Sequence, residues 1–580
     1  MDEKEYFIKP SSVTQKQYEA LRAFFLEELP AKDVAEKFGY TFRAFTSLAA
    51  DFRKKLRMLP DEDPFFLVRK PGRKELKEKA SIVSKVIQLR KKYLSVPDIK
   101  VALDGKGIKV SEKKIYLIVK QEGFARLPRR SKNERLSQEL PKIKPETSSE
   151  IDFMPGDKFS SNSAGLLCFW PYITKYGIDK IICESDYPET KAIPRFSSIM
   201  SFLALKLSNI RRYSADDLWC MDRGSGFFAC LNVLPKSAWL SSYSHRVTRK
   251  MNLSFLRKLH AIWKDKDLFG DTVNLDFTTI PYWGEGDHLE NNWSGKRRHS
   301  LSSILAVLAQ DADSGLIDYG DTNVLHKDQN AVVLEFLDFY RQSKTGNELK
   351  YLVFDSKFTT YQNLSKLDKQ DIKFITIRRR GKKIVEEINN LPLSNWKKVR
   401  VSCAGNKTRN LKVYDNIINL KGYYKELRQV AITGHGKIKP ALIITNDFEL
   451  KLEEVVRKYS KRWLIEKTIS EQIEFFHLNR VSSSMVIKVD FDLTMTITAH
   501  NLYRLLAMDL ERYSHMSDIS IYEKFIMNSG EIEVGNKNII VKLKKKKNLP
   551  LLLSVMKNFD SLQYSWTGNK NLIFEGMSIS

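Results

Sequence analysis

Cysteine is scarce in this sequence. The whole cysteine content is Cys168, Cys183, Cys220, Cys230 and Cys403. No two of these residues have CxxC spacing, which excludes a zinc ribbon and a CxxC redox motif. An odd number of scattered thiols in a long chain is typical of a protein in a reducing compartment.

Long apolar runs are also missing. The longest apolar stretches fall far short of the ~20 residues that a membrane-spanning helix needs. The N-terminus, Met-Asp-Glu-Lys-Glu, is charged and has no apolar run, so a signal peptide is not expected. No tandem repeat of solenoid period is visible. The sequence therefore predicts a protein of the cytoplasm with no membrane partner.

Acidic residues are fewer than basic residues. Lys and Arg number 97 against 70 Asp and Glu, a net charge of +27, and the isoelectric point is near 9.5. This excess predicts a partner that is a polyanion, nucleic acid above all. The alternative is a merely basic, soluble protein. At ~150 residues per domain, the 580 residues predict about four domains.

Residues 1–60 are predicted to form a helix-turn-helix unit of three helices. The second helix ends near Phe38 and Gly39 follows it, with Ala35 four residues earlier. Such a motif needs a small residue where its helices touch and a glycine in the turn. Arg43 lies on the third helix, where it suits a DNA groove. A plain helical hairpin is the alternative.

Residues 75–130 are predicted to form a second helix-turn-helix unit. Helices are expected at Ile82–Tyr93, Val96–Leu103 and Glu112–Glu122, the last capped by Ser111. A basic arm that contains a proline follows, and such arms commonly follow a minor groove or the phosphate backbone. The alternative for the arm is a solvated linker. Its DNA-binding candidates are Arg126, Arg129 and Arg130.

The rest of the chain divides by composition. Residues 131–163, rich in Ser, Pro, Lys and Glu, are predicted to be a linker, and 164–268 a helical segment. In 269–515 strands alternate with helices, which predicts a mixed α/β domain. Its stretch 378–446 is strand-rich. Residues 516–580 are predicted to be a basic, β-rich tail with a lysine cluster at 544–547.

Asp276 is the first candidate catalytic residue. In the expected strand around it, Val273, Leu275 and Phe277 alternate with polar residues, which places Asp276 on the opposite face. Strands are depleted in Asp, and a buried carboxylate must be hydrogen-bonded, paired or metal-bound. The alternative is an exposed acid on a solvated face.

Asp355 is the second candidate. Four apolar residues, Tyr351 to Phe354, predict a buried strand, and Asp355 falls at its carboxyl end. In open α/β sheets the ligand crevice lies at the carboxyl ends of strands. A turn-forming Asp is the alternative.

Glu466 is the third candidate. Tyr459, Arg462 and Glu466 have the spacing i, i+3, i+7, which puts all three on one helical face. A carboxylate, a guanidinium and a phenol on one face can contact a metal and a phosphate together. The alternative is a solvated face with an Arg–Glu pair.

Three carboxylates are hard oxygen ligands, which suit Mg²⁺ or Mn²⁺ better than zinc. Two such ions a few Å apart can activate a water or a 3′-hydroxyl and hold the leaving oxygen. The nine histidines are dispersed, and core roles are expected for His477 and His500.

Together these motifs resemble the insertion-sequence DDE transposases that carry a tyrosine–arginine–glutamate signature. The resemblance covers about 270–512, and Tyr459-x2-Arg462-x3-Glu466 matches the signature. The family often has a lysine seven residues after the Glu, where this chain has Ile473. Arg480 is a candidate replacement for that lysine.

The resemblance implies a multidomain α/β protein with a ribonuclease H-like mixed sheet and a β-strand insertion. All-α helix-turn-helix DNA-binding units would precede that domain. Asp276 would lie on the first strand, Asp355 on the fourth and Glu466 on a helix beyond the insertion. Tyr459 and Arg462 would hold DNA phosphates, and two Mg²⁺ or Mn²⁺ ions would be the cofactors.

Two basic runs near the triad are candidates for neutralising the charge of the DNA backbone. Each is as often a solvated face. One run comprises Lys296, Arg297 and Arg298, and the other comprises Arg378, Arg379 and Arg380. Trp283 is a candidate for stacking on a base, although a core or rim role is the more common one.

The implied function is transposition in a prokaryotic cell, with the protein associated with the nucleoid. The protein would bind the terminal inverted repeats of its element and the target DNA, as a homodimer on DNA. One alternative is a catalytically silent, domesticated transposase that acts as a sequence-specific DNA-binding regulator. Another is a metal nuclease that cuts without joining.

Overall fold

A computed structural model describes most of the chain. It covers residues 7, 9–58, 65, 79–125, 127, 148–211, 217–282, 289–294, 299–342, 348–403, 407–435, 440–478 and 486–578. Within these ranges the side chains of 79, 80, 217, 218, 294, 402, 403, 407, 463–473 and 487 are outside the description. The chain divides into two units, Met1–Lys144 and Pro145–Ser580. Of the helices described, none is both long and apolar enough to cross a membrane.

The first unit contains a bundle of α2 (Val13–Phe25), α3 (Ala31–Lys37) and α4 (Phe42–Met58). Its core includes Ala35 and the fully buried Phe45. Gly39 has φ +63° in the turn between α3 and α4, a conformation that glycine adopts without strain. The predicted small residue and glycine thus lie where the helices meet. The helix-turn-helix assignment itself stays a prediction.

A second bundle in this unit contains α5 (Lys79–Lys91), α6 (Val96–Asp104) and α7 (Glu112–Gln121). Ser95 caps α6 through a reciprocal pair of hydrogen bonds with Asp98, so two donors at the helix start are satisfied. Ser111 caps α7 as the sequence predicts, accepting a hydrogen bond from the Lys114 N–H. Arg126, Arg129 and Arg130 of the predicted arm lie outside the described residues.

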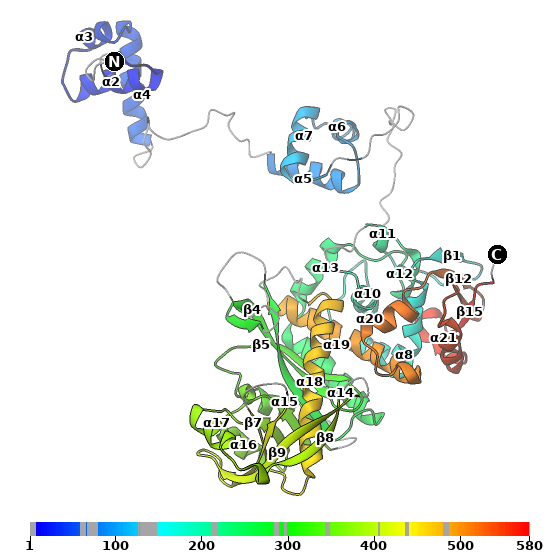
Figure 1. Ribbon diagram of the computed structural model, residues 1–580. Helices are drawn as coiled ribbons and strands as arrows, with labels where there is room; N and C mark the ends of the chain where they lie inside the picture. Colours follow the sequence, from blue (N-terminus) through cyan, green and yellow to red (C-terminus); the bar gives the residue numbers. More distant parts are fainter. Residues whose placement is uncertain are drawn as a thin grey trace. The chain divides into compact units, whose positions relative to one another are not determined.

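A ten-stranded mixed sheet is the centre of the second unit (Figure 1). Its first part has the spatial order β5-β4-β2-β6-β7, with β4 antiparallel to both neighbours and β2, β6 and β7 parallel. The short β3 pairs with β4. The bounds are β2 (Thr272–Pro281), β3 (Asn291–Ser294), β4 (His299–Asp311), β5 (Ile317–Val324), β6 (Tyr351–Phe354) and β7 (Lys373–Ile377).

The strand-rich stretch after β7 extends the same sheet. An antiparallel meander runs from β8 to β11, and β11 pairs with β7. Its strands are β8 (Lys397–Cys403), β9 (Lys407–Asn419), β10 (Glu426–Thr433) and β11 (Ala441–Thr445). The short helix α17 (Lys382–Asn389) lies between β7 and β8. The structure therefore has a mixed α/β architecture with a large mixed sheet, as expected.

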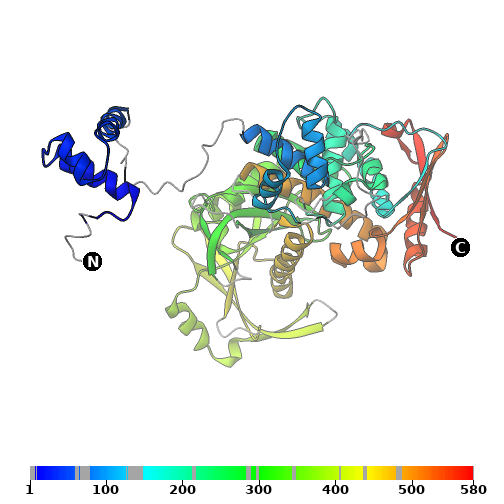
Figure 2. The same ribbon diagram turned by 90° about the horizontal axis from the view of Figure 1, so that it is seen from above.

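The alternation of side chains along the strands separates two cores. In β6, Leu352 and Phe354 join the main core, whereas Tyr351 and Val353 join a smaller one. The helix α18 (Leu452–Phe475) covers the smaller core. The main core lies under α14 (Arg249–Asp265), α15 (Val332–Tyr340), α16 (Tyr361–Asp368) and α19 (Val486–Asp509) (Figures 1 and 2).

Helices dominate the chain before the sheet. They are α8 (Trp170–Lys175), α9 (Ile178–Cys183), α10 (Arg195–Leu207), α11 (Asp217–Cys220), α12 (Arg223–Phe228) and α13 (Ser237–Tyr243). Their buried residues belong to the main core, in which α10 packs on α19. These helices therefore belong to the layer on the main-core side of the large sheet.

A second sheet joins the two ends of this unit. Its five strands have the order β1-β12-β13-β15-β14, beside the helices α20 (Asp518–Ile521) and α21 (Leu549–Met556). Because β1 pairs with β12, the range 131–163 that the sequence indicates as linker already contains a strand. Four residues with one large apolar side chain are too short a pattern to reveal it. The strands are β1 (Lys158–Ser161), β12 (Gly530–Val534), β13 (Asn538–Leu543), β14 (Gln563–Tyr564) and β15 (Lys570–Gly576).

Candidate active site

Asp276 and Asp355 lie on neighbouring parallel strands. Leu275 of β2 is opposite Phe354 of β6, so the next residue of each strand is an aspartate. Leu275 and Phe354 both belong to the main core, and alternation turns both aspartates to the face that α18 covers. Asp276 therefore lies midway along the ten-residue β2, Asp355 directly follows β6, and the two occupy adjacent positions on one face of the sheet. With β3 set aside, β2 and β6 are the first and fourth strands of the domain.

The two carboxylates have different partners. Asp276 is buried; one oxygen accepts the Phe277 backbone N–H (N···O 2.9 Å) and the other lies 3.3 Å from Nη1 of Arg462. Asp355 accepts hydrogen bonds from the backbone N–H and the hydroxyl of Ser356, the next residue. The requirement that a buried Asp276 be paired is thus met by an arginine.

Tyr459 and Arg462 face the sheet from α18, and both are buried. The Tyr459 ring packs into the smaller core, and the Arg462 guanidinium carbon lies 5.3 Å from the ring centroid. The helix continues without a break past 466, so the Glu466 backbone lies one turn beyond Arg462 on the same helical side. The Glu466 side chain is outside the described residues.

A cavity of about 680 Å³ opens beside Asp355, Tyr459 and Arg462. Asp355, Tyr459 and Arg462 line it, together with the predicted basic run at the end of β7. Five arginines but a single carboxylate are among the lining residues, so positive charge dominates; we call it the basic cavity. Its lining comprises Asp355, Ser356, Ile377, Arg378, Arg379, Arg380, Arg409, His435, Ala441, Tyr459 and Arg462.

Residues 268–502 match the family described as transposase DDE domain. This match confirms the resemblance to DDE transposases for that part of the chain, which contains the basic cavity and both aspartates. A cryo-EM structure of a piggyBac transposase synaptic complex with hairpin DNA is similar over 71% of this chain and 84% of that chain, at 12% identity and a TM-score of 0.33. No curated protein matches the chain in sequence.

Within the matched transposase region, hydrogen bonds hold the arginine run in place. Arg378 donates to the Gln429 side chain (2.6 Å), and Arg380 donates to the Pro440 carbonyl. Arg379 donates to the Ser356 carbonyl beside Asp355 (3.4 Å). The run is therefore tied to the loop after β6 and to the meander. The other basic run, Lys296, Arg297 and Arg298, lies outside the described residues, as do Trp283 and Arg480.

Two residues of the basic cavity were not predicted from the sequence. Arg409 comes from β9 and His435 from the turn after β10, and the Arg409 guanidinium donates to the His435 carbonyl (2.9 Å). Neither belongs to a motif, and each is far from the triad in sequence. Only the pairing of the meander strands brings them to the basic cavity, so no local signal marks them.

Of the two histidines singled out in the sequence, His500 is buried and His477 is half-buried. His500 contacts the Asp518 carboxylate through Nδ1 (2.7 Å) and the Gly315 carbonyl through Nε2 (3.0 Å). His477 contacts the Asn209 carbonyl (3.0 Å). Among the described side chains, which leave out Glu466, no group of three His, Cys, Asp or Glu is arranged to hold a metal.

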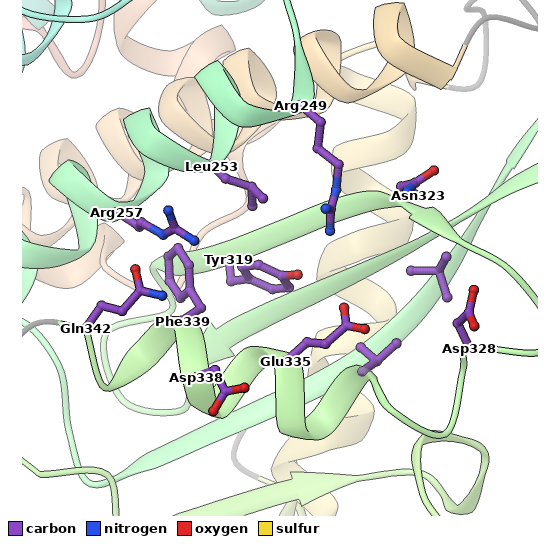
Figure 3. Close-up of a pocket in the computed structure, with 12 residues that line it drawn as sticks. Arg249, Leu253, Arg257, Tyr319, Asn323, Asp328, Glu335, Asp338, Phe339 and Gln342 are labelled. Atoms are coloured by element: carbon purple, nitrogen blue, oxygen red, sulfur yellow. The ribbon is translucent and has the colours of Figure 1, made fainter.

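A second cavity, of about 380 Å³, lies between α14 and α15 over β5 (Figure 3). None of the predicted site residues lines this α14–α15 cavity. Arg249 and Arg257 project from α14, and Glu335 and Asp338 come from α15 (Figure 3). Arg249 forms an ion pair with the buried Asp321, and this hydrogen-bonded pairing raises the pKa of the arginine. Burial, together with neighbouring acids, raises the pKa of Glu335.

Buried polar groups continue behind this cavity. Asp490 of α19 accepts hydrogen bonds from Asn252 of α14 (2.7 Å) and from the Thr322 hydroxyl of β5 (3.1 Å). Burial, together with the nearby Asp321, raises the pKa of Asp490 to about 6. Asp490, Asp321 and Arg249 are thus each paired or hydrogen-bonded within the protein.

Proposed function

We propose that this protein is a DDE transposase that cuts DNA at the ends of its mobile element and joins those ends to target DNA. The observation that supports this most is the pair Asp276 and Asp355, on neighbouring central strands and one face of the sheet, next to a cavity lined by arginines. The match of this region to the transposase DDE domain supports the same conclusion.

The reaction has two steps that use the same chemistry. In the first, a water oxygen attacks a phosphorus at the element end, the bond to the 3′ oxygen breaks, and a 3′-hydroxyl and a 5′-phosphate are left. In the second, that 3′-hydroxyl attacks a target phosphorus and displaces the target 3′ oxygen. Each attack is in line with the leaving oxygen.

Asp276, Asp355 and Glu466 would hold two Mg²⁺ or Mn²⁺ ions, since carboxylate oxygens are the ligands these ions prefer. The donor chemistry of the two described carboxylates fits this role, and the cation that now contacts Asp276 is the guanidinium of Arg462. When bound, such ions activate the attacking oxygen and stabilise the leaving oxygen.

The protein's own cations bind the DNA. Arg378, Arg379, Arg380 and Arg409 would neutralise backbone phosphates, while Tyr459 and Arg462 would hold the phosphates of the element end. His435 and Arg409 come from the meander, so the meander would cover the DNA end. Removal of water from the cleft would strengthen these contacts.

We further propose that the domain is ribonuclease H-like and that the N-terminal bundles are helix-turn-helix units. The strand order β5-β4-β2-β6-β7, with the meander inserted after β7, supports the first assignment. The bundles and the arm with Arg126, Arg129 and Arg130 would bind the terminal inverted repeats, helped by Arg43. Two DNA ends need two active sites, so the DNA-bound form would be a homodimer in the cytoplasm of a prokaryotic cell.

The test is cleavage and joining of labelled DNA taken from the flanks of the gene, with Mg²⁺. Wild type should cut and join. Asp276→Ala, Asp355→Ala and Glu466→Ala should each bind DNA but lose both reactions by roughly 10²–10⁴-fold, because several kcal/mol of transition-state stabilisation are removed. Glu387→Ala on α17, an exposed acid of the same domain, is the control and should act as wild type.

Two outcomes would contradict the proposal. Wild type that binds the ends but never cuts with Mg²⁺ or Mn²⁺ would be a regulator. Cut ends without strand-transfer products would indicate a nuclease.

A further inference from the structure

Asp276 has a cation of the protein as its partner. Its Oδ2 lies 3.3 Å from Arg462 Nη1, and the two side chains are only 12% and 5% exposed. A carboxylate this deeply buried is unstable unless a cation or hydrogen bonds offset its charge. Arg462 supplies that cation from α18, across the face of the sheet.

The same arginine also lines the basic cavity, where the DNA phosphates would lie. Its guanidinium therefore stands between two anionic partners, the Asp276 carboxylate and a phosphate. A divalent cation on Asp276 would repel the guanidinium, since like charges at contact distance disfavour each other. The cation and Arg462 are thus competitors for one carboxylate.

Asp355 provides the internal comparison. It faces the same cavity, but its hydrogen bonds come from Ser356, the residue that follows it. It forms no ion pair with any arginine that the structure describes. Loss of the Asp355 charge would therefore change the potential of the cavity without releasing an arginine.

We propose that Arg462 is a positioning residue that couples binding of the divalent cation to binding of DNA. It neutralises Asp276, and it moves to a DNA phosphate when a cation takes over that carboxylate. This inference rests on the proposed function. By thermodynamic reciprocity, the cation raises the DNA affinity by the same factor by which DNA raises the cation affinity.

The experiment measures binding of a labelled duplex from the element end to the full-length protein by fluorescence anisotropy, with EDTA or with Ca²⁺. Ca²⁺ is used because it takes carboxylate ligands. For wild type, Ca²⁺ should raise the DNA affinity by roughly 5- to 100-fold, the usual range of coupling between two sites. Asp276→Asn should bind DNA in EDTA nearly as tightly as wild type does with Ca²⁺.

The matched control is Asp355→Asn, which removes the same charge from the same cavity. It should raise the DNA affinity in EDTA by less than about threefold, the size expected for one screened charge. In an Arg462→Gln background, Asp276→Asn should give no gain beyond that of Asp355→Asn. Arg462→Lys keeps the positive charge and should retain low affinity in EDTA, and thermal unfolding checks that each variant is folded.

Two results would overturn the coupling. One is an equal gain in EDTA for Asp276→Asn and Asp355→Asn, and the other is a full gain for Asp276→Asn without Arg462. If either result is found and the wild-type protein still cuts and joins DNA, the coupling is disproved and the proposed function stands. A wild type that never cuts would contradict the proposed function instead.

Discussion

Two cavities on one sheet use the same residue types in opposite ways. In the basic cavity, five arginines are among the lining residues and Asp355 is the single carboxylate. In the α14–α15 cavity, the lining includes Arg249 and Arg257 together with Asp328, Glu335 and Asp338, and Asp321 pairs with Arg249 (Figure 3). Positive charge is in excess in the first, whereas carboxylates outnumber arginines in the second.

This difference in charge balance distinguishes arginines that can bind a ligand from arginines that stabilise the fold. Arginines that outnumber their acidic neighbours keep donors available for phosphates, which is what a DNA site needs. Arg249, paired with a buried Asp321, instead holds α14 to β5. An arginine on its own is therefore no sign of a DNA site, and the balance of its surroundings decides. The following variants test that distinction, in order of expected effect.

The largest contrast should come from Asp355→Ala against Asp321→Ala. The first should reduce cleavage by about 10³-fold with little change in Tm, because it removes a carboxylate from the proposed metal site. The second should lower Tm and leave the cleavage rate per folded molecule near that of wild type. Equal losses of cleavage in both variants would contradict a catalytic role for Asp355 and a structural role for Asp321.

Arg249→Ala should destabilise the fold. It leaves the Asp321 carboxylate, which is 2% exposed, without its ion-pair partner, and breaking such a pair costs about 3 kcal/mol. Urea unfolding followed by circular dichroism measures this. Arg257→Ala, at the exposed mouth of the same cavity, should cost less than about 0.5 kcal/mol. Similar values for the two would mean that Arg249 does not hold α14 to β5.

Replacing Arg378, Arg379 and Arg380 together by Gln should weaken DNA binding roughly 10- to 100-fold at moderate salt. It should also flatten the plot of log affinity against log salt by up to about three units, since each lost phosphate contact removes close to one. Replacing the exposed Lys180, Lys191 and Lys557 together by Gln removes the same charge outside the basic cavity. An equal effect on DNA affinity from this triple variant would favour general charge over a defined site.

The smallest effect concerns pH. Because the pKa of Asp490 is raised from 3.8 to about 6 in the folded protein, the folded state binds more protons than the unfolded state between these values. Asp490 therefore favours the fold at low pH, and this contribution is lost as the pH rises through about 6. Relative to Asp490→Asn, wild type should lose about 2 kcal/mol of stability between about pH 4.5 and 7. A constant difference would contradict the raised pKa.

The sequence identified the parts of the site that local patterns encode. Period-two alternation indicated which face Asp276 takes, and an apolar run marked Asp355 as the end of a buried strand. Helical spacing placed Tyr459 and Arg462 on one face of α18. Each of these depends on a few neighbouring residues, so one sequence is enough.

Contacts between segments that are far apart in the chain cannot be predicted from the sequence alone. Nothing local indicates that the meander brings Arg409 and His435 to the basic cavity, or that Arg462 contacts Asp276. The main core also joins α19 to the helices that precede the sheet. Gly320 shows how specific such contacts are, because a Cβ there would come within 2.5 Å of the Ile497 side chain.

The pairing of β1 with β12 sets the order in which the chain can fold during synthesis. Lys158 lies opposite Glu533, so the first strand of the second unit lacks its partner until almost the entire chain has left the ribosome. The N-terminal bundles depend on contacts within Met1–Lys144 and can form long before that. A nascent or prematurely terminated chain would then carry folded N-terminal bundles and an unfinished second unit. Under the proposed function, such a chain would compete for the same DNA as the complete protein without being able to cut it.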